Sequence, residues 1–65
     1  MNIVDAKVTQ DDDGKFVVIA IEQDTGADGE LVFSERVVLR ATQYEAQNKL
    51  KQLERIFQLE PARAG

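Results

Sequence analysis

Along most of the chain the order of polar and apolar residues is typical of β-strands. In residues 2–9 apolar and charged residues alternate, which is the pattern of a strand that buries one face. Residues 15–23 contain an unbroken apolar run, as expected of a central strand covered on both faces. Residues 30–40 resume the alternation. Because they exceed the usual strand length, we expect a bulge near Ser34 and Glu35.

Two glycine-containing segments separate these predicted strands. Three Asp residues precede Gly14 in the first segment, and the second, residues 24–29, holds two Gly and two Asp. Both compositions are typical of tight hairpin turns, in which glycine supplies a positive φ. We therefore expect each pair of neighbouring strands to be antiparallel.

A helix signal follows the third strand. Thr42 and Glu45 fit a capping box, in which the Thr hydroxyl accepts a backbone N–H and the Glu side chain reaches back to the cap. The pattern predicts a helix from Gln43 to Glu60, ended by Pro61. Its apolar residues fall on one face and are better suited to packing on the sheet than to a coiled coil. They are Ala46, Leu50, Leu53 and Phe57. Tyr44, in the first turn, is expected to pack on the sheet as well.

The predicted fold is α+β, a three-stranded antiparallel meander followed by one C-terminal helix packed on one sheet face. We expect residues 1–61 to form a single small domain and residues 62–65 a disordered tail. A chain of this size buries about 60% of its unfolded surface, so its core must be tight. The predicted core comprises Val4, Val8, Val17, Ile19, Ile21, Leu31, Phe33, Val37, Leu39, Leu50, Leu53 and Phe57.

One helix covers only one face of a sheet, yet the central strand offers apolar residues to both. The second face is therefore expected to be an interface, most simply between two copies of this chain in a homodimer. Its predicted residues are Phe16, Val18, Ala20, Val32 and Val38. The alternative is that sheet curvature, the long stems of Lys15 and Arg36, and the N-terminal strand cover this face within the monomer. A register step of one residue would exchange the two faces.

Composition narrows the range of functions. The chain has 8 Lys plus Arg, 12 Asp plus Glu, a net charge of −4, no His and no Cys. No residues are spaced as a nucleophile with its base, so we expect neither an enzyme nor a cofactor. The longest apolar run is six residues, against the roughly 20 that a membrane helix needs. No basic segment precedes an apolar one at the N-terminus, so a cytoplasmic location is expected.

Residues 24–35 resemble the calcium-binding loop of an EF-hand. Acidic residues stand at the first, fifth and twelfth positions, namely Asp24, Asp28 and Glu35, and a glycine stands at the sixth. The third position is Gly26, which offers no side-chain oxygen, and the flanking segments are predicted strands rather than helices. A hairpin loop is therefore favoured over a calcium site.

The order of elements is similar in outline to the N-terminal DNA-binding domain of some phage and transposon integrases. That resemblance implies a sheet that enters the major groove. The sheet of that family is basic, whereas the strands here carry acidic residues beside basic ones. Nucleic-acid binding, or an acidic surface that occupies a DNA-binding protein, is the alternative function. The favoured one is a non-enzymatic interaction or accessory module of a bacterium or phage.

Overall fold

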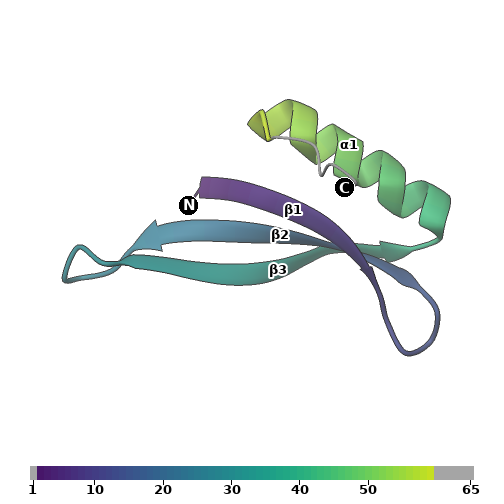
Figure 1. Ribbon diagram of the computed structural model, residues 1–65, viewed down its shortest axis with the longest axis horizontal. Helices are drawn as coiled ribbons and strands as arrows, with labels where there is room; N and C mark the ends of the chain where they lie inside the picture. Colours follow the sequence, from purple (N-terminus) through teal and green to yellow (C-terminus); the bar gives the residue numbers. More distant parts are fainter. Residues whose placement is uncertain (1, 60–65) are drawn as a thin grey trace, which may run out of the picture.

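The computed structural model describes residues 2–59 and confirms the predicted fold. β1 (Asn2–Gln10), β2 (Phe16–Thr25) and β3 (Leu31–Ala41) form one antiparallel sheet in the order β1-β2-β3, and α1 (Gln43–Phe57) follows. The helix lies over one sheet face, and the far end of the β2–β3 hairpin extends past it (Figure 1). The predicted tail, residues 62–65, lies outside the described residues.

The first hairpin turn is held by the carboxylate of Asp11. Its Oδ1 accepts hydrogen bonds from the backbone N–H groups of Asp13 and Lys15, both at 2.9 Å, and Gly14 takes a positive φ of 81°. Arg40, on β3, donates to the carboxylates of both Asp11 and Asp13. The acidic run is therefore tied to the end of the sheet.

These contacts change the ionisation of Asp11. Loss of water around the carboxylate raises its pKa, but the hydrogen bond from Arg40 lowers it. The backbone hydrogen bonds from Lys15 and Asp13 and the charge of Arg40 lower it further. The lowering effects prevail, so the pKa of Asp11 lies below its ordinary value of 3.8.

The second hairpin has the predicted glycine turn. The N–H of Gly26 donates to the carbonyl of Glu30 at 2.8 Å, and the N–H of Gly29 donates to the carbonyl of Gly26 at 2.9 Å. Gly29 has a φ of 81°, a value at which an L side chain is strained. The turn therefore depends on glycine at this position.

The core lies between α1 and one face of the sheet, which we call the inner face. Val18 of β2 pairs with Val8 of β1 and Leu39 of β3, so the three side chains share this face. The buried cluster contains Ala6, Val18, Ala46 and Leu53, with Val8, Phe16, Leu39, Leu50 and Leu59 packed against it. Alanines on both β1 and α1 allow the helix backbone to approach the sheet closely.

The predicted assignment of the two faces is wrong. The first hairpin pairs Val8 with Val18, so the apolar face of β1 continues onto Val18 and Ala20 rather than onto Val17 and Ile19. Val17 is buried as predicted, but on the face away from the helix. Val18 and Ala20 are buried beneath the helix. Alternation along one strand cannot decide which face is buried, because the register set by the turn decides it. Five predicted core residues are exposed instead, namely Val4, Leu31, Phe33, Val37 and Phe57.

The bulge in β3 lies at Val38 and not at the predicted Ser34 and Glu35. Leu39 pairs with Val18 and Val37 pairs with Ile19, which leaves Val38 as the extra residue. A second irregularity lies in β1, between Ile3 and Asp5.

Helix α1 begins at the predicted cap and ends earlier than predicted. The Thr42 hydroxyl oxygen accepts from the N–H of Glu45 at 3.3 Å and donates to the Glu45 carboxylate at 2.9 Å. At the other end Gln58 takes the left-handed conformation, with a φ of 55°, and the N–H groups of Gln58 and Leu59 both donate to the carbonyl of Glu54. The left-handed Gln58 and the hydrogen bond from Leu59 to Glu54 are features of a Schellman-type helix end, so the helix ends at Phe57 and not at the predicted Glu60.

Two aromatic residues of the helix lie outside the core. Tyr44 does not pack on the sheet as predicted, because 76% of it is exposed. Phe57 belongs to the predicted apolar stripe but is only partly covered, since it stands at the end of the helix.

Candidate interaction surface on strand β3

Strand β3 is the most exposed element of the sheet. It is an edge strand, and its first eight residues, 31–38, are all exposed. Five of the eight are apolar and form what we call the β3 patch: Leu31, Val32, Phe33, Val37 and Val38. Long apolar edge strands are uncommon in proteins that remain monomeric, because their free N–H and C=O groups can pair with another chain.

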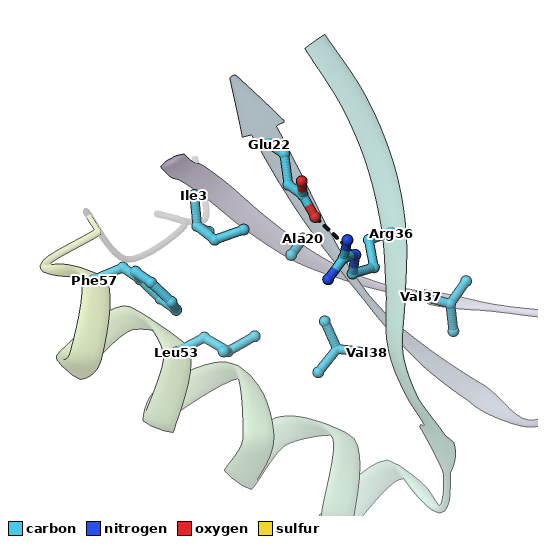
Figure 2. Close-up of a pocket in the computed structure, with 8 residues that line it drawn as sticks. All are labelled: Ile3, Ala20, Glu22, Arg36, Val37, Val38, Leu53 and Phe57. Carbon is cyan, nitrogen blue, oxygen red and sulfur yellow. Dashed lines mark ion pairs between the residues drawn. The ribbon is translucent and has the colours of Figure 1, made fainter. Parts of the chain in front are cut away.

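The β3 patch has its most exposed residues on the outer face, away from α1. Leu31, Phe33 and Val37 pair with Thr25, Gln23 and Ile19 of β2, and all of these belong to the outer face. Leu31, Phe33 and Val37 are 58%, 57% and 63% exposed. In Figure 2, Val37 points away from the helix, whereas Val38 points toward it.

An ion pair crosses the middle of the outer face. The Nζ of Lys7, on β1, lies 3.2 Å from Oε2 of Glu35, on β3. Lys7 pairs with Ile19 and Glu35 pairs with Ile21, so the two side chains meet across the central strand. Both side chains are more than half exposed. The outer face therefore carries an exposed ion pair beside the half-buried Ile19 and Ile21 of β2, and its most exposed apolar residues lie along β3.

An open groove of about 410 Å³ separates the end of α1 from the inner face. Leu53 and Phe57 line it from the helix side, and Ile3 and Val38 line it from the sheet (Figure 2). The groove is mainly apolar, and its charged lining is the pair formed by Glu22 and Arg36.

Glu22 is a buried carboxylate at the edge of this groove. It is 5% exposed, and the Nε of Arg36 lies 2.7 Å from its Oε1. Among the described residues Oε1 of Glu22 accepts no hydrogen bond of good geometry. The contact between Glu22 and Arg36 is therefore mainly an electrostatic attraction between two opposite charges. Burial of a charge is costly, and Arg36 is therefore needed to keep this carboxylate inside the fold.

The five residues predicted for an interface do not lie on one surface of the protein. Phe16, Val18 and Ala20 lie on the inner face under α1, where Val18 is fully buried. Val32 and Val38 are exposed and belong to the β3 patch. Leu31, Phe33 and Val37 were missed because the sequence pattern assigned them to the core. The signal that could have found them is the register of the first hairpin. If the turn is taken to pair Val8 with Val18, then Leu31, Phe33 and Val37 fall on the face opposite the core.

The three carboxylates of the predicted calcium loop do not converge. Asp24 is the last residue but one of β2 and occupies a position of the inner face, and Asp28 lies in the following turn. Glu35 belongs to the outer face and pairs with Lys7. Within residues 2–59 no three His, Cys, Asp or Glu side chains are grouped to hold a metal ion.

Comparison with protein-family models, curated proteins and solved structures finds no match to the chain. In the part of the chain that the structure describes, no helix is long and apolar enough to cross a membrane.

Proposed function

We propose that this protein is a non-enzymatic interaction module that self-associates through the β3 patch. The observation that carries the proposal is the exposure of eight consecutive residues on an edge strand, five of them apolar. Exposed apolar patches larger than a few hundred Å² usually mark interaction sites. Two-fold association is the commonest way in which a small domain covers such a surface.

Two alternatives have less support. The chain has neither His nor Cys to serve as a base or a thiol nucleophile, which weakens the case for an enzyme. The cations of the outer face are engaged within the chain, since Lys7 pairs with Glu35 and Arg40 pairs with Asp11 and Asp13. Side chains that already pair with carboxylates of the same chain contribute little to the binding of DNA phosphates.

The proposal is tested by the solution mass of the chain, measured by light scattering over a series of concentrations at low and high salt. We expect a mass twice that of the single chain, and we expect it to persist in salt because the contact is apolar. The Phe33→Ser variant should shift the mass toward the monomer. Ile56→Ser is the matched control, since Ile56 is equally exposed but lies on α1.

Two results would contradict the proposal. One is a monomer at every concentration. The other is a dimer that is weakened by Ile56→Ser and not by Phe33→Ser, because that result would place the contact on the helix.

A further inference from the structure

We infer that the partner of β3 is the same strand of a second copy, paired antiparallel about a two-fold axis at Phe33. This inference rests on the proposed function and adds its geometry. The two sheets would then join edge to edge into one continuous sheet, with each α1 on the same side.

The edge of β3 is open where the inferred pairing takes place. Residues 31–37 precede the bulge at Val38, contain no proline and run as regular strand. The far end of the β2–β3 hairpin extends past α1, so a strand can approach it without meeting the helix (Figure 1). Bulges, prolines and very short strands are the usual means of preventing edge pairing, and this segment has none of them.

A two-fold axis limits the registers that β3 can adopt. Opposed residues of an antiparallel pair lie on the same face, so the residue on the axis meets its own copy and its neighbours meet in reversed order. An axis at Glu35 or at Arg36 would set like charges directly against each other, which is destabilising. An axis at Val37 or beyond would draw the bulge into the ladder. An axis at Leu31 or Val32 would leave only a short overlap.

Phe33 and Ser34 remain as positions for the axis, and charge favours Phe33. Glu35 opposes an apolar residue of the second copy in both registers, Phe33 with the axis at Ser34 and Leu31 with the axis at Phe33. Only the axis at Ser34 makes the two Glu35 side chains diagonal neighbours, which is unfavourable. With the axis at Phe33, the two aromatic rings oppose each other, which is a favourable cross-strand pair.

The ends of this register also match in charge. Glu30 precedes β3, and with the axis at Phe33 it comes level with Arg36 of the second copy. Arg36 contacts Glu22 through Nε, and its terminal nitrogens carry further N–H donors that a carboxylate of the second copy can use. Two such pairs, one at each end, would fix the register by opposite charges.

Face-to-face packing of two outer faces is less favourable. It would bury the Lys7–Glu35 ion pair, whose side chains are more than half exposed in the single chain. Removal of such a pair from water often costs more than the attraction between its charges returns. Edge pairing leaves this ion pair in water and still sets the two Phe33 side chains against each other, with Leu31 of each copy diagonal to Phe33 of the other.

The chain contains no cysteine, so single cysteines report the geometry directly. With the axis at Phe33, Val32 opposes Ser34 of the second copy. Val32→Cys and Ser34→Cys variants are mixed, allowed to exchange subunits and oxidised, and the disulfide-linked products are separated by mass. We expect the mixed disulfide in clear excess over the share that random pairing gives. Thr9→Cys, on the opposite edge strand, is the control and should stay unlinked.

The other results separate the inference from the proposed function. Predominant self-linking of Ser34→Cys would overturn the axis at Phe33. A lack of linking by both variants, with the mass of a dimer under reducing conditions, would overturn edge pairing while self-association stands. A lack of linking with the mass of a monomer would overturn both.

Discussion

Glu22 and Arg36 stand on neighbouring strands and form an ion pair in which one partner is buried and the other faces water. Glu22 is 5% exposed, whereas the Arg36 side chain is 59% exposed, and 2.7 Å separates Nε from Oε1. The register of β2 and β3 explains the contact, because Arg36 pairs with Ala20, one step along the inner face from Glu22. The stability of the end of the sheet that α1 leaves uncovered should therefore depend on this pair.

Removal of Arg36 should destabilise the fold, because it leaves a buried carboxylate without its counter-charge. We expect Arg36→Ala to lower the free energy of unfolding by about 1–2 kcal/mol, less than for a fully buried pair because water screens the exposed partner. The Glu22→Leu/Arg36→Ala double variant should recover most of this loss, since it removes the buried charge as well.

Urea unfolding followed by circular dichroism measures these differences. Arg55→Ala is the control, because Arg55 is an exposed arginine of α1. Equal stability of Arg36→Ala and Arg55→Ala would show that the ion pair does not stabilise Glu22.

The exchange of the two sheet faces leads to a second prediction. Val18→Asp should abolish folding, because the carboxylate would be placed at a fully buried site without a partner. Val37→Asp changes a residue that is 63% exposed and should cost about 1 kcal/mol or less. Far-ultraviolet circular dichroism distinguishes the two variants. A folded Val18→Asp protein would contradict the placement of β2 beneath the helix.

The sequence was sufficient for the elements and their order but not for the faces. Gly14 and Gly29 marked both turns, and Thr42 marked the start of the helix, because each of these signals is local. The burial of Val18 depends on the register of the first hairpin, which no single strand reveals. Leu31, Phe33 and Val37 of the β3 patch were mistaken for core for the same reason, since apolar residues of an edge strand look alike whether a helix covers them or not.

The Asp11 carboxylate should make the stability of the fold depend on pH. Its pKa is lowered in the folded state, so its contribution is present above the ordinary value of 3.8 and is lost as the pH falls through the folded value. Asp11→Asn keeps an oxygen for the backbone N–H groups but loses the charge opposite Arg40. We expect this variant to be less stable at neutral pH and to lose less stability on acidification.

Asp12→Asn is the matched control for this effect. Asp12 lies in the same turn, and in the described part of the chain no hydrogen bond or ion pair of its carboxylate is found. Urea unfolding at neutral and acidic pH gives the comparison. If Asp11→Asn and the parent chain lost equal stability on acidification, the pairing of Asp11 with Arg40 would not contribute to the fold.

The end of α1 offers a way to stabilise the protein. Gln58 holds a φ of 55°, which is strained for any residue with a Cβ, and Leu59 beyond it packs on the core. Gln58→Gly should raise the free energy of unfolding by about 0.5–1 kcal/mol, because glycine adopts this conformation without strain. Gln58→Ala, which keeps the Cβ, should leave the stability nearly unchanged in the same urea titration. If both variants were equally stable, or if glycine were the less stable of the two, the helix would not end in the left-handed conformation at Gln58.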